Sequence, residues 1–213
     1  MASHSSVERS SDAAADTAVL ITARDDAARI ALTVLRAREL PGVVEVVVAD
    51  LGSSDSTARV AADSGALVLR APAGGWRQAE GLRRAATAAS GHPLLLVLRA
   101  GLQEAATRAG ALLEPLRAGE TDAAFGRSDA GPRTLCWDFA VTAEAFRTAL
   151  PLAEGAGLPS GMIIDLRRNG FRTTELVLDL PAAPKLRWRQ RREVARALRG
   201  RRTAAEAPAA GRH

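Results

Sequence analysis

Short runs of apolar, β-branched residues alternate along this chain with alanine-rich segments of helical character, and this alternation restricts the possible folds most strongly. The runs at 43–49 (VVEVVVA) and 94–98 (LLLVL) are the clearest, and the second contains no polar residue. A strand that is apolar on both sides is buried on both faces, as in parallel sheets covered by helices. Alternating strands and helices therefore predict an α/β domain with a mostly parallel sheet and helices on both faces.

The individual elements follow from runs of this kind and from the breaks between them. Pro41 and Gly42, for example, end a helical pattern just before the strongest strand. The expected strands lie at 18–21, 43–49, 66–69, 94–98, 122–125 and 173–180. The expected helices lie at 25–40, 57–64, 76–90, 103–116, 143–150 and 160–169. The segment 132–140 is expected to be either a loop or an antiparallel strand.

Composition divides the chain into three parts and excludes some classes of protein. Residues 1–16 are rich in Ser, Ala and Asp and predict a mobile lead, 17–182 form the domain, and 183–213 form a basic, partly helical tail. Hydrophobic residues at 47% exclude a disordered chain, and aromatic residues at 3% exclude an aromatic-rich β-sandwich. The sequence has no apolar run long enough to cross a bilayer, no pattern of a secretory leader and only one cysteine, Cys136. We therefore expect a cytoplasmic protein.

The positive charge is concentrated in the tail. Residues 185–202 hold nine basic residues and one acid, so this segment has a net charge of +8. The whole chain has a net charge of +5, so the rest of the chain has a net charge of −3. Such a helix can lie on an anionic membrane surface, at the inner face of the membrane, and Trp188 favours that interpretation. Binding to nucleic acid is a less expected alternative, and a surface helix packed on the domain is equally compatible with the pattern.

Ligands of open α/β sheets bind beyond the carboxyl ends of the strands, so candidate site residues are sought there. The segment that follows the first strand, 22–26 (TARDD), contains no glycine, which excludes a dinucleotide-binding turn and a P-loop. After the second strand, Asp50 and Gly52 precede a capped helix. Asp50 either accepts hydrogen bonds from a nucleotide or only caps this turn.

Five segments in this order resemble the family-2 glycosyltransferases, which have the GT-A fold. They are 21–26 (ITARDD), 48–57 (VADLGSSDST), 75–82 (GWRQAEGL), 95–101 (LLVLRAG) and 170–176 (GFRTTEL). The resemblance implies a GT-A-like, Rossmann-type domain that transfers a sugar from a nucleotide-diphosphate-sugar donor to an acceptor, such as a polyprenyl phosphate. It places the nucleotide sugar against Thr22, Ala23, Arg24, Asp25, Asp50, Gly52, Ser53 and Arg77. Arg77 would lie near the pyrophosphate, or would be a solvated arginine at the start of a helix.

The chain departs from this family at the residues that usually bind a divalent metal. Arg99, Ala100 and Gly101 stand where the family has D-x-D, and Leu51 replaces the second aspartate of the D-D-G-S motif. No metal site of the family's kind is therefore expected, although Mg²⁺ or Mn²⁺ is the family's usual cofactor. Arg99 would supply positive charge in place of the metal.

The remaining acids offer one candidate general base. Asp138 is expected in a loop after the edge of the sheet, where it would act as the base or contact the acceptor, and Asp165 is expected to be an exposed acid on a helix. Two functions remain open. The first is glycosyl transfer without the usual metal motif, and the second is a non-catalytic descendant that binds a nucleotide sugar or serves as a scaffold.

Overall fold

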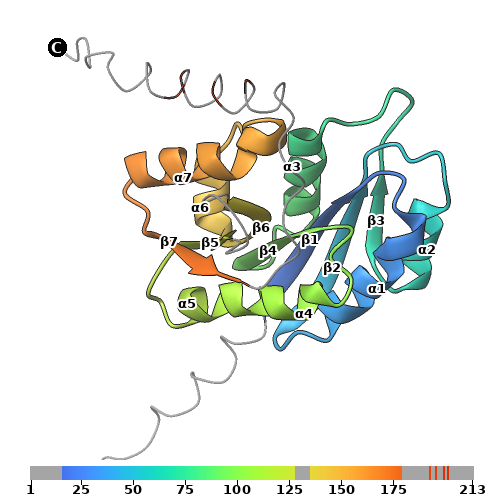
Figure 1. The fold of residues 1–213 in the computed structure, drawn as a ribbon, viewed down its shortest axis with the longest axis horizontal. Coiled ribbons are helices and arrows are strands. Elements are labelled where there is room, and N and C mark those ends of the chain that lie inside the picture. Colours follow the sequence, from blue (N-terminus) through green and yellow to red (C-terminus); the bar gives the residue numbers. More distant parts are fainter. Residues whose placement is uncertain are drawn as a thin grey trace, which may run out of the picture.

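A seven-stranded mixed sheet with the strand order β3-β2-β1-β4-β6-β5-β7 forms the centre of the molecule in the computed structural model (Figure 1). The structure describes residues 16–127 and 135–178, together with 192, 195, 199 and 201. All but residue 16 of the predicted lead at 1–16, and most of the predicted tail at 183–213, lie outside the described residues. The strands are β1 (Thr17–Ala23), β2 (Val43–Asp50), β3 (Leu67–Arg70), β4 (Leu94–Arg99), β5 (Ala123–Arg127), β6 (Leu135–Thr142) and β7 (Thr173–Val177).

The sheet is parallel except for one strand. β1 to β4 all run in the same direction, and β6 is antiparallel to both β4 and β5. β7 is parallel to β5 and lies at the edge of the sheet. The carboxyl ends of β1, β2, β3, β4, β5 and β7 therefore share one edge of the sheet, at which β6 begins. This is the mostly parallel α/β arrangement that the alternating sequence predicts.

Helices cover both faces of the sheet (Figure 1). One layer holds α1 (Ala27–Arg38), α2 (Thr57–Asp63), α4 (Ala105–Ala109), the 3-10 helix η2 (Gly110–Leu113) and α5 (Glu114–Arg117). The other layer holds α3 (Gln78–Ala88), α6 (Ala143–Thr148) and α7 (Leu158–Arg168), with the 3-10 helix η3 (Gly155–Gly157) before α7. No described helix is long and apolar enough to cross a membrane.

The central strand β1 shows why these residues form a two-faced sheet. Val19 and Ile21 point into the core under α1 and α4, while Leu20 points into the core under α3, and all three are fully buried. Burying each such side chain contributes about 1.5–3 kcal/mol relative to leaving it in water. The single cysteine, Cys136, is also buried in this core, and burial raises the pKa of its thiol.

The structure differs from the prediction at 103–116 and decides between the two alternatives at 132–140. The single helix expected at 103–116 is wrong, because this segment forms α4, η2 and α5 in succession. Gly110 lies so close to Leu40 that a Cβ there would be 2.7 Å from the leucine Cδ2, and Pro115 lies in the first turn of α5. Within 132–140, the described residues from Leu135 onward form the antiparallel strand β6, which decides between the two alternatives for this segment.

Candidate functional site

A small pocket of about 380 Å³ lies at the carboxyl ends of β1, β2 and β3. Four of the predicted nucleotide-binding residues, which are Arg24, Asp50, Gly52 and Ser53, line it. The remaining lining residues follow β3 or end it, and they are Arg70, Ala71, Pro72, Ala73, Gly74 and Gly75. The sequence therefore predicted one half of this pocket and missed the half that the segment after β3 supplies.

Asp50 is the buried acid of this pocket, with 1% of its surface exposed. Its Oδ1 accepts hydrogen bonds from the backbone N–H of Ser53, at 2.9 Å, and from the Ser53 hydroxyl. Its Oδ2 lies 3.9 Å from Nε of Arg70. Gly52 makes this turn possible, because its φ of +102° is unfavourable for residues with a side chain. Asp50 therefore caps its turn, as one alternative predicted, with its second oxygen facing an arginine of the pocket.

Reciprocal hydrogen bonds join the loop after β1 to the loop after β2. Asp25, which has a φ of +52°, accepts from the backbone N–H of Ser54 at 2.8 Å. In the opposite direction, the backbone N–H of Asp25 donates to the Ser53 hydroxyl at 3.0 Å. The backbone N–H of Ala27 donates to Asp55 at 3.1 Å, and a hydrogen bond from Thr57 lowers the pKa of the Asp55 carboxyl. The Asp25 side chain thus holds two loops together.

Two of the predicted residues contact neighbouring segments instead of lining the small pocket. The Thr22 hydroxyl accepts a hydrogen bond from Nε2 of Gln78, at 3.4 Å, which ties the end of β1 to the start of α3. Ala23 is buried, and its carbonyl accepts from the backbone N–H of Leu51 at 2.9 Å. Both residues therefore bind residues that line the larger pocket described below, Gln78 and Leu51, without lining it themselves.

Two glycines let the loops after β2 and β3 approach each other closely. A Cβ on Gly52 would lie 3.1 Å from Cα of Gly75, and a Cβ on Gly75 would lie 2.7 Å from the carbonyl oxygen of Leu51. That carbonyl accepts a hydrogen bond from the backbone N–H of Trp76 at 3.2 Å. The wall of the small pocket therefore depends on backbone contact that a side chain would prevent.

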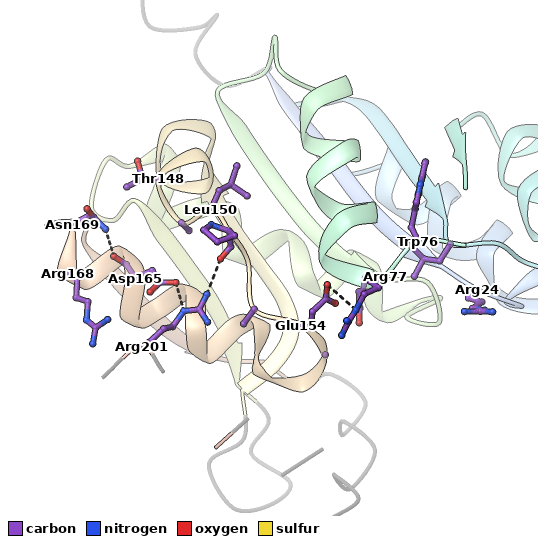
Figure 2. A pocket seen from close by; sticks show the side chains of 16 residues that line it. Arg24, Trp76, Arg77, Thr148, Leu150, Glu154, Asp165, Arg168, Asn169 and Arg201 are labelled. Carbon is purple, nitrogen blue, oxygen red and sulfur yellow. Dashed lines mark hydrogen bonds and ion pairs between the residues drawn. The ribbon is translucent and has the colours of Figure 1, made fainter. Parts of the chain in front are cut away.

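A larger pocket of about 1100 Å³ adjoins the small one, and Arg24 lines both (Figure 2). It lies on the face of the sheet that α3, α6 and α7 cover. Four arginines and two acids line it, together with small, polar and apolar residues. The full lining is Arg24, Leu51, Trp76, Arg77, Gln78, Thr148, Ala149, Leu150, Pro151, Ala153, Glu154, Gly155, Asp165, Arg168, Asn169 and Arg201.

Glu154 and Arg77 face each other inside this larger pocket (Figure 2). Oε1 of Glu154 lies 3.5 Å from Nε of Arg77, and Oε2 accepts from the backbone N–H of Ala79 at 3.4 Å. The Arg77 side chain is 80% exposed and that of Glu154 37%. Arg77 is thus exposed at the start of α3, as its solvated alternative predicts, and it also lines a pocket. Sequence reasoning missed Glu154, which lies outside the five segments that carry the family resemblance.

Asp165 is not the exposed helix acid that the sequence predicts. It lies in α7, and its Oδ2 accepts from Nε of Arg201 at 2.6 Å. Each of these two side chains is 20% exposed. Spacing could not have predicted this pair, because its members are 36 positions apart.

Asp138, expected in a loop, lies instead in the middle of β6 and is completely buried. Its carboxylate accepts two hydrogen bonds from Arg99, from the backbone N–H at 3.0 Å and from Nε at 3.0 Å, and Nη2 of Arg99 lies 2.9 Å from Oδ2 in an ion pair. Burial raises the pKa of Asp138, and the Arg99 guanidinium opposes that increase. Neither residue is among those that line the two pockets described above. The predicted catalytic pair is therefore an ion pair at the end of β4, in which the charge of Arg99 is already balanced.

This sheet, with pockets at the carboxyl ends of its parallel strands, has the GT-A fold of nucleotide-sugar glycosyltransferases. Among solved structures, it is similar to glucosyl-3-phosphoglycerate synthase from Mycobacterium tuberculosis. The structure of that enzyme with Mn²⁺, uridine diphosphate and phosphoglyceric acid is 22% identical, with a TM-score of 0.74, over 92% of this chain and 81% of that one. Its structure with Mn²⁺, uridine-diphosphate-glucose and phosphoglyceric acid is 20% identical, with a TM-score of 0.72, over 94% of this chain and 85% of that one.

A third structure of the same enzyme, with Mg²⁺ and uridine diphosphate, is 20% identical, with a TM-score of 0.74, over 94% of this chain and 84% of that one. No family model and no curated protein matches the chain. At these identities the likeness establishes the fold, and the expected GT-A architecture is confirmed.

The residues at the end of β4 do not fit a divalent cation of the kind present in those neighbours. Such a cation takes oxygen ligands, chiefly from carboxylates, whereas Arg99, Ala100 and Gly101 supply a guanidinium, a methyl group and a bare backbone. The nearby carboxylate, Asp138, is already bound to Arg99. Across the described parts of the chain, no group of three or more His, Cys, Asp or Glu side chains could hold a metal ion.

Proposed function

We propose that this chain is a glycosyltransferase that binds a uridine-diphosphate sugar at the carboxyl edge of its sheet and transfers the sugar to an anionic acceptor. The observation that carries this proposal is the pair of adjoining pockets, joined at Arg24, on a GT-A sheet. A transferase needs one site for the nucleotide and a second for the sugar and acceptor. Two of the neighbours named above were solved with uridine diphosphate, and the third with uridine-diphosphate-glucose.

The small pocket is the proposed nucleoside site. Asp50 offers a buried carboxylate to the ring N–H of a base or to ribose hydroxyls, and Arg24 and Arg70 lie beside it. The diphosphate would then lie at the junction of the two pockets, near Arg24 and Arg77. Guanidinium groups bind phosphate oxygens through paired, charge-assisted hydrogen bonds, which offset the charge of the leaving diphosphate.

Glu154 is the proposed general base. Its carboxylate is partly exposed in the larger pocket, whereas that of Asp138 is buried. In the transfer, Glu154 accepts the proton of the acceptor hydroxyl, and the acceptor oxygen forms a bond to the anomeric carbon of the sugar. The bond from that carbon to the phosphate oxygen breaks, and its electron pair leaves with uridine diphosphate.

The acceptor is proposed to carry a phosphate or carboxylate group. The larger pocket has four arginines, namely Arg24, Arg77, Arg168 and Arg201, against two carboxylates, so its lining has a net positive charge. Leu150 and Pro151 also line it and add apolar surface. Two of the neighbours named above were solved with phosphoglyceric acid. A polyprenyl phosphate, which the sequence resemblance implies, has the same anionic group and an apolar chain.

Calorimetric titration with uridine diphosphate, in the presence of a chelator, tests the donor site. Asp50→Asn keeps the size of the side chain and removes its charge, and it is expected to weaken binding about 10-fold or more, since a hydrogen bond to a charged group contributes about 1.5–3 kcal/mol. Asp63→Ala is the matched control, because Asp63 is an exposed acid of α2 outside both pockets. Equal affinity for all three proteins would refute the nucleotide site.

A non-catalytic nucleotide-sugar-binding protein is the second candidate, and the Arg99–Asp138 ion pair at the end of β4 favours it. Turnover distinguishes the two. The release of uridine diphosphate from uridine-diphosphate-glucose is followed in the presence of phosphoglyceric acid. Under the first proposal wild type releases it, and Glu154→Gln abolishes release without weakening donor binding, because Arg77 keeps its charge and loses only its carboxylate partner. Donor binding without any release, over a panel of phosphorylated acceptors, would favour the second candidate.

A further inference from the structure

The larger pocket contains a binding site for a guanidinium group, and Arg201 of the predicted tail at 183–213 occupies this site. Nε of Arg201 donates to the Asp165 carboxylate at 2.6 Å, and Nη2 donates to the backbone carbonyl of Pro151 at 3.0 Å. These two acceptors come from separate elements, α7 and the segment between α6 and η3. Figure 2 shows Arg201 between them, with both interactions drawn. A surface arginine that only extends into water would not have two acceptors placed in this way.

A glycine in α7 leaves room for this arginine. A Cβ on Gly161 would lie 3.3 Å from both Cζ and Nε of Arg201, and 3.0 Å from Cβ of Ala153. Both members of the Arg201–Asp165 pair are 20% exposed, so the pair is partly withdrawn from water. Charge pairs that are shielded in this way are screened less by salt than exposed pairs.

We propose that Arg201 anchors the basic tail on the larger pocket and itself forms part of the pocket wall, so that this docking and the binding of an anion stabilise each other. Arg201 lines the pocket rather than filling it, because the volume of about 1100 Å³ is present with Arg201 seated. The part concerning the anion rests on the proposed function, which takes the acceptor to be anionic.

The charge of Asp165 connects docking to the binding of an anion. This carboxylate also lines the pocket, and without Arg201 it would present an unpaired negative charge to an incoming anion. With Arg201 seated, the charge of Asp165 is balanced. If docking strengthens anion binding, the bound anion must strengthen docking by the same factor, because the two events are thermodynamically linked.

Docking is tested without any ligand, on full-length variants. Urea unfolding is measured for wild type, Arg201→Ala, Asp165→Asn and the double variant. A docked pair is expected to give a coupling of about 3-fold or more in the unfolding equilibrium constant. The exposed pair Arg59–Asp63, in which the atoms are 3.5 Å apart, is the matched control and is expected to give less than about 2-fold. A coupling for Arg201 and Asp165 no larger than that of the control pair would overturn docking.

The effect on anion binding is tested by titration with phosphoglyceric acid at fixed ionic strength. Arg201→Ala is expected to weaken binding about 3- to 10-fold, and adding Asp165→Asn to it should restore affinity to within about 2-fold of wild type, because the unpaired carboxylate is then gone. Asp165→Asn alone should bind at least as tightly as wild type, and Arg59→Ala should be unchanged. Uridine diphosphate is titrated in parallel.

The outcomes of these titrations distinguish a failure of the docking proposal from a failure of the proposed function. Arg201→Ala that binds phosphoglyceric acid as wild type does would refute a role for the docked segment in the pocket. Weakened binding that Asp165→Asn fails to restore would mean that Arg201 contacts the anion directly, which refutes the mechanism through Asp165. Failure of wild type to bind phosphoglyceric acid, with uridine diphosphate still bound, would overturn this acceptor class and the linkage to anion binding. The unfolding experiment would then still decide docking.

Discussion

The buried ion pair between Arg99 and Asp138 leads to a prediction whose size and pH dependence both follow from the structure. In wild type, Asp138 is completely buried, accepts one side-chain and one backbone hydrogen bond from Arg99, and forms an ion pair with its guanidinium. Arg99→Ala keeps the backbone bond and removes the guanidinium. Removing one partner of a buried pair costs about 3–5 kcal/mol, because the remaining charge stays buried without compensation. We expect Arg99→Ala to lose about 3 kcal/mol of unfolding free energy at pH 8.

The complementary variant should cost less. Asp138→Asn removes the buried charge, and the amide oxygen can still accept a hydrogen bond. The side chain of Arg99 is 23% exposed and can regain water on that side. We expect a loss of about 1–2 kcal/mol, close to the value for a hydrogen bond with a charged partner. In the double variant the buried charge is absent, so it should be more stable than Arg99→Ala at pH 8.

The pH dependence of this loss has a definite sign. Burial raises the pKa of Asp138 above its value in the unfolded chain, and Arg99→Ala raises it further because the guanidinium no longer opposes the increase. The folded protein then binds more protons than the unfolded one at any pH between the unfolded pKa, about 3.9, and the raised folded pKa. Stability falls as pH rises through that window, so the loss caused by Arg99→Ala should be small near pH 4.5 and largest at pH 8.

Urea unfolding followed by circular dichroism at pH 4.5, 6 and 8 measures these losses for the four proteins of the cycle. The cycle isolates the interaction of Arg99 with Asp138 from any other contact that Arg99 makes. A loss below about 1 kcal/mol for Arg99→Ala at pH 8 would contradict the cost expected for a broken buried pair. An equal loss at pH 4.5 and pH 8 would show that the charge of Asp138 is not its cause.

Two further predictions concern the loop after β3 and the surface of α3. Gly75→Ala should destabilise the fold by about 1–3 kcal/mol and weaken the binding of uridine diphosphate. The reason is that φ of Gly75 is +74° and the new Cβ would lie 2.7 Å from the Leu51 carbonyl oxygen. Thermal unfolding measures the first effect, and calorimetric titration measures the second. Glu80 should titrate by NMR with a pKa of about 2, lowered by Arg83 and then by Arg84, so the stabilisation from these ion pairs should be lost as pH falls from about 4.5 to about 2. The loss should stay below about 1 kcal/mol because the pairs lie at the helix surface, and a Glu80 pKa near 4.5 would refute these ion pairs.

The sequence predicted the fold better than it predicted the site. Apolar runs identified six of the seven strands, because a strand buried on both faces has few polar residues, whereas β6 was left open between a loop and an antiparallel strand. One long helix was predicted at 103–116, because the apolar residues there have helical spacing, but the segment forms three short helices. The close approach of Gly110 to Leu40 joins positions 70 residues apart, and local periodicity cannot reveal such a contact.

For the site, the sequence located the residues that follow β1 and β2 but could not show how distant side chains pair. Arg99 and Asp138 were chosen as separate catalytic candidates, and the structure joins them in one ion pair across 39 positions. Asp138 also looked like a loop residue, because an acid in the middle of a buried strand is rare unless a partner neutralises it. That partner lies on another strand, β4, and only the sheet register brings the two together.

The reciprocal hydrogen bonds between the loops after β1 and β2 have a consequence for the divergence of such sequences. Asp25 accepts from Ser54, the backbone of Asp25 donates to Ser53, and the backbone of Ala27 donates to Asp55. A substitution that removes one partner leaves the other without its hydrogen bond, which costs more than replacing both. The donors here are backbone N–H groups, which are present whatever the residue, so only the acceptor side chains of Asp25, Ser53 and Asp55 can be lost by substitution. These three positions should therefore tolerate few substitutions among homologous chains, whereas the neighbouring exposed positions of α2 should vary more freely.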